Sequence, residues 1–447
     1  MVKIFANSPE CIKSELDLFY VPPTNTSITK GSWEECQTTH GLDSNVLEFV
    51  VKGNAQEYIH LNKTSLYLKI SISKRDNDAL KTIADTDSIS CVNNLANSLF
   101  SQVDVKLNTT SLETSNRTYP YKAYLLDLLN FGEDAKETFM QSSLYYKDDA
   151  NEFDTLNIIK ATKDGDLNTN DGFLKRRKIL LDGSGKVELL TKIHSDIFNS
   201  DRFLLNNIDI NVTLYRSKDT FCLMHPKAST FEIKLEAATL FVRKCEITPS
   251  ILEAHSLALQ QATAKYPIKR VILKSFNLNA NTESETVTVQ SGNLPTRIVF
   301  GLVESESFNG AANKNPFNFK NFNLSELFVT VDSKNVSYNQ PLKFNFEKNQ
   351  YIRGYNTLFE GIDKPVYANG NYISRQDYPN GYALFAYDMS PDLCSGDHFN
   401  LIQTGKLCIN MVFTKGLSKP VTLITLLEFD NMIEISETRQ IILDYIP

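Results

Sequence analysis

The 447-residue chain has little Gly, Pro or Trp, with 18, 15 and 1 of each, and its formal net charge is only −7. Few and aperiodic Gly and Pro exclude a repetitive fibrous structure. Because 42% of the residues are hydrophobic, the chain can build substantial cores, which excludes a disordered protein. A mild acidic excess argues against a protein that coats nucleic acid, since neutralising phosphates requires a basic face.

The cysteines are few and form no C-x-x-C pair. They number seven and stand at positions 11, 36, 91, 222, 245, 394 and 408. An odd, scattered set predicts neither a disulfide scaffold nor a zinc module. Reduced thiols in a cytosolic or nuclear compartment are expected instead.

Long hydrophobic runs are also missing. No stretch approaches 18 consecutive apolar residues, and the opening MVKIFANS lacks the apolar run of a signal peptide. The N-x-S/T sequons at Asn62, Asn211 and Asn335 therefore read as chance products of an Asn- and Thr-rich composition. The sequence predicts a soluble intracellular protein without membrane insertion.

The motifs of nucleophilic and metal chemistry are missing as well. There is no G-x-S-x-G elbow, no His-x-His cluster, and no paired spacing among the histidines at 40, 60, 194, 225, 255 and 398. The pair Cys222 and His225 is better explained by an ordinary buried cysteine than by a ligand pair or a catalytic dyad. The sequence predicts no enzyme, no cofactor, and no catalytic, cofactor-binding or metal-binding residues.

Two fragments resemble ligand loops without completing them. The segment 182–186 (DGSGK) has Leu180 and Val187 where a phosphate-binding loop needs Gly and a hydroxyl, so a hairpin turn is predicted. The segment 164–172 (DGDLNTNDG) alternates oxygen ligands as calcium loops do. Thr169 and Lys175 stand where such loops need Gly and Glu, so a solvated loop is predicted.

One dense basic cluster is present, at Lys175, Arg176, Arg177 and Lys178. Such a cluster could serve nuclear import or contact phosphate, and the sequence leaves the import role open. No aromatic side chain interleaves with it for stacking on bases, and acidic residues lie close by. We expect a solvated junction between a loop and a strand.

Strand patterns dominate both halves of the chain. In residues 65–74 (SLYLKISISK), apolar and polar side chains alternate with a period of two, which is typical of a strand with one buried face. The same alternation recurs at 103–107, 208–214, 231–235, 407–413 and 421–429. Alternating strand and helix units are missing, so β-sandwiches are favoured over a doubly wound sheet.

Helix patterns are few. Residues 119–132 have Pro near the start and Gly at the end, which predicts a short helix. Residues 248–265 predict another helix, with Ser250 and Glu253 at capping-box spacing and Pro267 ending the run. This helix stands just past the middle of the chain, so we interpret it as the connector between two domains.

The two halves also resemble each other. Residues 210–215 and 231–247 are similar to 409–413 and 421–435, and residues 99–104 are similar to 327–332. The offset near 200 residues indicates a duplicated sandwich whose loops have diverged.

Several longer strings go beyond alternation, among them SELDLFYVPPTNTSI at 14–28, NNLANSLFSQVDVKLN at 93–108 and YPYKAY at 119–124. They resemble the major capsid protein of Polinton (Maverick) elements and adintoviruses. Further matches lie at 195–198, 240–244, 264–268, 315–319, 351–355 and 381–388. They run in order along nearly the whole chain, and none is a short generic motif.

This resemblance implies an all-β double jelly-roll protein, with two tandem eight-stranded antiparallel sandwiches and a few short helices. We expect an extended N-terminal arm at 1–40, a first jelly roll at 41–247, a helical connector at 248–266 and a second jelly roll at 267–447. The arm is expected to pack under the base of the assembly or onto a neighbouring subunit.

The resemblance also implies the function of a structural major capsid protein. Homotrimers would form pseudo-hexameric capsomers that tile an icosahedral shell, with a single jelly-roll penton protein at the vertices. The shell would enclose double-stranded DNA without binding it strongly, and virions would assemble in the host cytoplasm or nucleus. The family supplies no catalytic residues.

A rival interpretation is a carbohydrate- or receptor-binding β-sandwich module. Such a module needs an exposed aromatic platform, yet Trp33 is the only Trp and lies in the expected arm. The 19 Tyr and 27 Phe are mostly embedded in strand or helix patterns, where core packing is expected.

Overall fold

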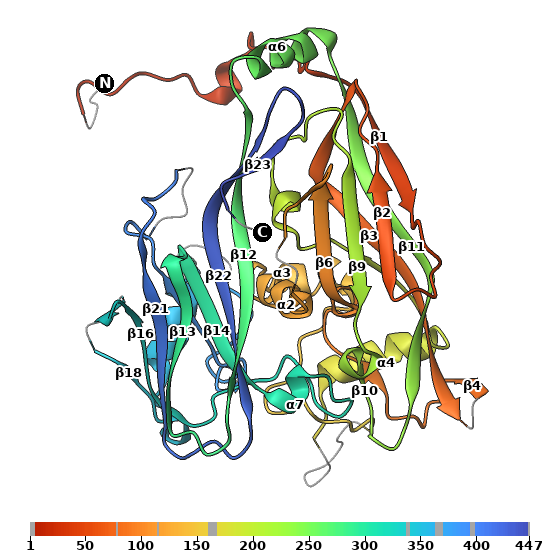
Figure 1. The fold of residues 1–447 in the computed structure, drawn as a ribbon, viewed down its shortest axis with the longest axis vertical. Helices are drawn as coiled ribbons and strands as arrows, with labels where there is room; N and C mark the ends of the chain where they lie inside the picture. The colour runs from red at the N-terminus through yellow and green to blue at the C-terminus, as the bar shows by residue number, and fades with distance from the viewer. Residues whose placement is uncertain are drawn as a thin grey trace.

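A computed structural model describes residues 5–76, 79–113, 116–159, 168–336, 340–362, 370–393 and 398–445. Two antiparallel β-sandwiches lie side by side, with short helices between and around them (Figure 1). The alternation in residues 65–74 has the predicted effect, because Leu66, Leu68, Ile70 and Ile72 are buried while the residues between them face outward.

The first sandwich consists of two sheets. One sheet has the order β1-β11-β3-β4, and β8 pairs with the same side of β3 as β4 does. Its strands are β1 (Ile28–Gln37), β3 (Glu57–Asp76), β4 (Ala79–Thr82), β8 (Lys186–Thr191) and β11 (Phe231–Ile247). The other sheet has the order β2-β9-β6-β7. Its strands are β2 (Val46–Val51), β6 (Phe100–Leu107), β7 (Thr110–Ser111) and β9 (Ile210–Arg216).

The second sandwich repeats this plan. One sheet has the order β12-β22-β14-β20, with β23 paired to β22. Its strands are β12 (Ala264–Leu278), β14 (Arg297–Glu304), β20 (Leu384–Asp388), β22 (Val421–Ile435) and β23 (Ile441–Leu443). The other sheet has the order β13-β21-β16-β17, with β18 paired to β16. Its strands are β13 (Ser284–Asn293), β16 (Leu324–Val331), β17 (Lys334–Asn335), β18 (Leu342–Lys343) and β21 (Thr404–Phe413).

Both sandwiches have one and the same connectivity. When the eight principal strands of each are counted in chain order, one sheet reads first-eighth-third-sixth and the other second-seventh-fourth-fifth. The sequence similarity between the halves therefore matches strands at equivalent places in the two sandwiches, β9 with β21 and β11 with β22. It also matches β6 with β16, but the residues that the sequence similarity aligns are not at equivalent places in the ladders. Leu107 lies opposite Ile210 in the first sandwich, whereas Val329 lies opposite Ile409 in the second.

Two longer helices lie in the connection between β7 and β8. Helix α2 (Tyr119–Asn130) confirms the helix predicted at 119–132. Helix α4 (Asp171–Asp182) has no counterpart in the predictions. Shorter elements of the described chain are η1 (Ser14–Leu16), β5 (Ser90–Cys91), α1 (Leu95–Ser98), α3 (Glu133–Lys136), η2 (Phe139–Ser143), η3 (Asp196–Asn199), α5 (Asp219–Cys222), β10 (Leu223–Met224), α7 (Ser305–Phe308), β15 (Phe319–Lys320), η4 (Phe346–Lys348), α8 (Ile352–Glu360) and β19 (Asn380–Gly381).

The helix between the sandwiches is shorter than predicted. Helix α6 (Pro249–Leu259) begins after the N-cap residue Thr248, so Ser250 and Glu253 do not form the predicted capping box. Pro267 does not end the helix, because it lies inside β12. Strand β12 is at the edge of its sheet, where proline is tolerated because no neighbouring strand needs its missing N–H.

The N-terminal arm is also shorter than the range 1–40 expected from the sequence. Strand β1 begins at Ile28 and pairs with β11 along its length, so residues 28–37 belong to the first sandwich. Residues 5–26 precede it and contain no helix or strand other than the short η1. We call residues 5–26 the N-terminal arm; it leaves the body beside α6 and extends to the side of the second sandwich, away from the first (Figure 1).

The buried apolar residues form two clusters, one centred on each sandwich, and α2 contributes to both. Tyr119 and Ala123 belong to the core of the first sandwich. Tyr121, Tyr124 and Leu128 belong to the core of the second. Because residues three or four apart share a helix face, one helix can present a separate face to each core. Helix α2 therefore joins the two sandwiches through buried apolar packing.

Candidate functional site

The junction between the sandwiches is held by aromatic stacking. The ring of Tyr124 on α2 stacks on that of Phe317 in the second half, with centroids 4.1 Å apart and an interplanar angle of 7°. Tyr121 stacks on Phe308 at 5.4 Å. Buried aromatic pairs stabilise by about 0.5–1.5 kcal/mol beyond their area. This packing joins the two sandwiches closely.

A buried ion pair reinforces the same junction. Arg176 Nη2 on α4 lies 2.6 Å from Asp148 Oδ1, and both side chains are fully buried. The second half also donates to Asp148, since Asn315 Nδ2 lies 3.2 Å from Asp148 Oδ2 and Tyr382 Oη lies 2.6 Å from the Asp148 carbonyl oxygen. A buried charge needs several such partners, so Asp148 connects the halves chemically as well as sterically.

A second buried cluster spans the junction nearby. Lys122 Nζ on α2 lies 2.8 Å from Asp196 and 3.4 Å from Glu113. Asp196 also accepts a hydrogen bond from the Val271 backbone N–H of β12 at 3.1 Å. Burial, together with the neighbouring Glu113, raises the pKa of Asp196 above its ordinary value although Lys122 opposes the shift. Two carboxylates here share one ammonium group.

Exposed apolar side chains gather in two segments. The N-terminal arm carries Phe5, Ile12, Leu16, Leu18, Phe19, Tyr20 and Val21, which are 64–95% exposed. The connection between β20 and β21 carries Leu393, Phe399, Leu401 and Ile402, which are 51–88% exposed. Contiguous apolar surface of this kind marks interaction sites in soluble proteins. We regard both segments as candidate contact surfaces.

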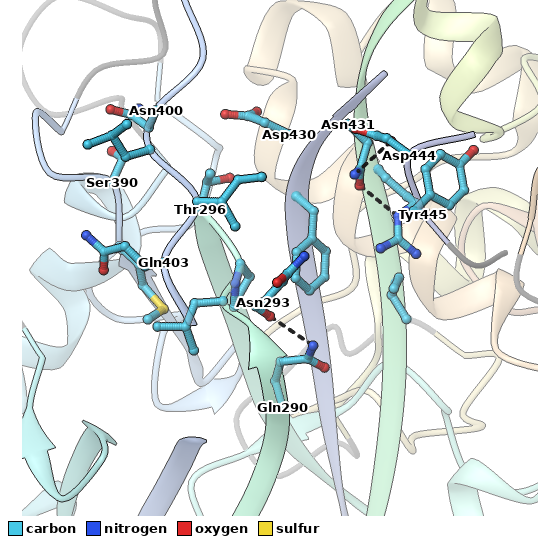
Figure 2. A pocket seen from close by; sticks show the side chains of 18 of the residues that line it. Gln290, Asn293, Thr296, Ser390, Asn400, Gln403, Asp430, Asn431, Asp444 and Tyr445 are labelled. Atoms are coloured by element: carbon cyan, nitrogen blue, oxygen red, sulfur yellow. Dashed lines mark hydrogen bonds between the residues drawn. The ribbon is translucent and has the colours of Figure 1, made fainter. Parts of the chain in front are cut away.

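Beside the second segment lies a pocket of about 510 Å³ (Figure 2). Its wall includes the Arg270 guanidinium, which donates to Asn431 Oδ1 at 2.9 Å and lies over the ring of Tyr445 at 4.4 Å. Asn431 in turn donates to Asp444 at 3.1 Å. Among the described residues, the lining holds no His or Cys, and the Arg270 guanidinium is already held by these partners.

Comparison with known proteins identifies the fold. No protein-family model matches the chain. An uncharacterized protein of Caenorhabditis elegans is 23% identical over 440 residues, covering 95% of this chain and 100% of that protein. A chain of the Sputnik virophage matches with TM-score 0.65 and 11% identity, over 99% of this chain and 94% of that chain.

Two further solved structures are similar along their whole lengths. The Faustovirus major capsid protein has TM-score 0.56 and 10% identity, with 96% and 93% of the two chains covered. The mavirus major capsid protein has TM-score 0.52 and 11% identity, with 98% and 97% covered. The chain has the double jelly-roll fold. The sheet orders described above carry the same conclusion, and they confirm the predicted fold class.

In this double jelly-roll chain the basic cluster is not the predicted junction between a loop and a strand. Residues 175–178 lie on α4, and Arg176 points into the interior. Arg177 donates to backbone carbonyls of Asp85 and Asp87, so only Lys175 and Lys178 are exposed. The four charges therefore do not form one surface patch, and the local sequence gives no sign of the inward turn of Arg176.

The two ligand-loop fragments lie at the ends of the same helix. Residues 182–186 join α4 to β8, so they form a helix-to-strand turn and not the predicted hairpin turn. Gly185 is required there, because its φ is +84° and an added Cβ would lie 2.4 Å from the Ile72 carbonyl oxygen. Of the segment 164–172, residues 164–167 lie outside the described residues. Asn170 is the N-cap of α4 and accepts from the Phe173 N–H at 3.2 Å.

The other residues considered in the sequence analysis do not come together in a site, because each has its own partner. Cys222 Sγ donates to the Ser98 carbonyl oxygen at 3.2 Å, whereas His225 packs on the ring of Phe231 at 5.0 Å. Among the described residues, no three His, Cys, Asp or Glu side chains are grouped so that they could hold a metal ion. Trp33 lies on β1 and is half exposed, with the Arg243 guanidinium 5.6 Å from its ring.

Proposed function

We propose that this chain is a structural capsid subunit that assembles as a homotrimer into pseudo-hexameric capsomers. The observation that carries the proposal is the duplicated strand order, which places two sandwiches of one topology side by side in a single chain. Three such chains around a three-fold axis present six similar lobes, and a six-lobed unit packs hexagonally. Capsomers of this shape would tile an icosahedral shell.

The junction between the sandwiches supports this role. A lattice unit must keep its two lobes in a fixed relation, because each lobe contacts different neighbours. Helix α2 packs into both cores, and Asp148 accepts hydrogen bonds from both halves. Buried networks that are fully paired favour one rigid arrangement.

We propose the division of the chain that the sequence suggested, with a shorter arm and a shorter connector. An arm at 5–26 precedes a first jelly roll that begins with β1, α6 connects the lobes, and β12 opens the second jelly roll. The arm and the connection between β20 and β21 supply apolar contact surface toward other subunits. Self-association is therefore the main interaction of the protein.

The finer assignment follows the sequence strings quoted above. We assign the chain to the Polinton and adintovirus group of major capsid proteins, located in the virion and assembled in the host cytoplasm or nucleus. A single jelly-roll penton protein would occupy the vertices. With a net charge of −7, the shell would enclose double-stranded DNA without strong direct binding. In the described part of the chain, no helix has the length and apolarity needed to cross a membrane.

The test is the mass and shape of the purified protein. Sedimentation should give three times the chain mass of 50.6 kDa, and electron microscopy should show three-fold particles with two lobes per chain. A strict monomer under all assembly conditions would overturn the proposal. Glycan binding by such a monomer, lost in Trp33→Ala, would favour the carbohydrate-binding alternative.

A further inference from the structure

The N-terminal arm is apolar but uncovered. Every described residue from Phe5 to Thr26 is exposed except Ser8, and the arm carries seven large apolar side chains. Phe19 is 95% and Val21 81% exposed. Exposing so many apolar groups on one short segment is unfavourable in water, so the arm is built to be covered.

An apolar groove of about 530 Å³ lies where the arm joins the body. One wall is α6, which contributes Ile251, His255, Ala258 and Leu259. Their spacing of three or four residues places them on one helix face. The facing wall is formed by residues at the ends of β3, β11 and β12 and in the segment 202–205. We call this cavity the α6 groove.

The polar groups inside the α6 groove already have partners. Tyr58 Oη and His255 Nδ1 are 2.9 Å apart, and Tyr266 Oη donates to the Phe203 carbonyl oxygen at 3.0 Å. The groove therefore offers mainly apolar surface to an occupant. An occupant rich in leucine and aromatic side chains would bury that surface without breaking a hydrogen bond.

The charges of the arm and the groove are complementary. Arg202 and Lys265 line the groove, and none of the described carboxylates does. Lys265 also pairs with Glu434 at 3.0 Å, whereas the exposed Arg202 donates to the Lys265 backbone carbonyl. Within residues 10–18 the arm has three carboxylates, Glu10, Glu15 and Asp17, against the single cation Lys13. Opposite charges at the rim would fix the direction in which the arm enters.

The arm projects away from its own body and is long enough to reach another (Figure 1). A fully extended segment of 22 residues spans at most about 75 Å. We propose that residues 16–21 of one copy seat in the α6 groove of a neighbouring copy. This inference rests on the proposed function, because assembly must first bring two copies together.

The test is a disulfide cross-link between two different chains. Each chain carries only one of the two cysteines, so the cross-link can form only between copies. Both carry Cys11→Ser; one adds Leu18→Cys, and the other, with a different tag, adds Ala258→Cys. After co-expression and mild oxidation of the assembled protein, a covalent product of both tags should appear on a non-reducing gel. Ser256→Cys, on α6 but outside the groove lining, is the matched control in place of Ala258→Cys. We expect at least a tenfold higher yield with Ala258→Cys than with Ser256→Cys.

Each outcome has a defined meaning. Equal yields at positions 256 and 258 in trimers of normal mass would overturn the arm proposal and leave the proposed function intact. Failure of the trimer itself would be seen separately by sedimentation. A link that forms within one chain carrying both Leu18→Cys and Ala258→Cys, without the mixed product, would assign the groove to the same copy. Flotation on phosphatidylserine vesicles that is lost in Leu18→Asp, without the mixed product, would assign the arm to a lipid surface.

Discussion

Arg176 Nη2 lies 2.6 Å from Asp148 Oδ1 in a site that water does not reach. The guanidinium also donates to the Cys91 and Tyr146 carbonyl oxygens at 2.9 and 2.6 Å. Arg176 belongs to the basic cluster at 175–178 that suggests nuclear import, yet its guanidinium is buried in the interior. Its role is to neutralise the carboxylate that both jelly rolls contact.

Replacing Arg176 by Met should lower the free energy of unfolding by about 3–5 kcal/mol, because Asp148 would keep a buried charge without its partner. Urea unfolding measures this loss. Lys175→Met on the same helix is the control and should change stability by less than about 0.5 kcal/mol. Adding Asp148→Asn to Arg176→Met should recover part of the loss. Equal effects of the two single variants would contradict the assignment.

Gly381 should not tolerate a side chain. Its φ is +117°, and an added Cβ would lie 2.1 Å from the buried ring of Phe153. Gly381→Ala therefore combines backbone strain with a steric clash, and we expect a loss of about 2–4 kcal/mol.

Two other glycines distinguish the effect of backbone strain from that of the steric clash. Gly292 has φ +96° with open space around it, and Gly370 has open space and no positive φ. Thermal unfolding should rank the three alanine variants with Gly381 worst, Gly292 intermediate and Gly370 near the parent. A Gly381→Ala variant as stable as Gly370→Ala would show that the close approach to Phe153 is wrong.

Asp196 should make stability depend on pH. Its pKa is raised in the folded protein by burial, so the folded state binds the proton more tightly than the unfolded chain. The stability of the folded protein therefore falls as pH rises from about 4 to about 7, the interval between the ordinary pKa of 3.8 and the raised pKa of about 7. Asp196→Asn should remove this fall, so that the unfolding midpoint changes less with pH over the same interval. The exposed Asp201→Asn should leave the slope unchanged, and an unchanged slope in Asp196→Asn would contradict this account.

The thiols should differ widely in reactivity. Cys11 is exposed, whereas burial raises the pKa of Cys36 to about 11 and that of Cys91 to about 12. Because the thiolate is the reactive form, maleimide should label Cys11 at least about 100-fold faster than either buried thiol. Peptide mass mapping of native protein, with urea-unfolded protein as the reference, gives these rates. Rapid native labelling of Cys91 would show that its region opens.

The parts of the fold that local pattern controls could be predicted from sequence. Strand β3 follows from the alternation of apolar and polar residues, and helix α2 follows from the Pro near its start and the Gly after its end. Helix α4 was missed because its charged tetrad looks solvated, and the partner that draws Arg176 inward lies 28 residues upstream. The α6 groove could not be foreseen, since its lining comes from several segments distant in the chain. Exposure of the arm was foreseeable from the sequence, but the surface that would cover the arm is formed by other parts of the fold.

The pairing of β1 with β11 has a consequence for synthesis. Roughly 200 residues separate Gln37 from its partner Thr239. At typical translation rates a ribosome needs about 10–40 s to add that length. During this time β1 offers an unpaired backbone edge to other nascent chains. The yield of folded protein should therefore fall as more chains are made at once, whatever the stability of the finished subunit.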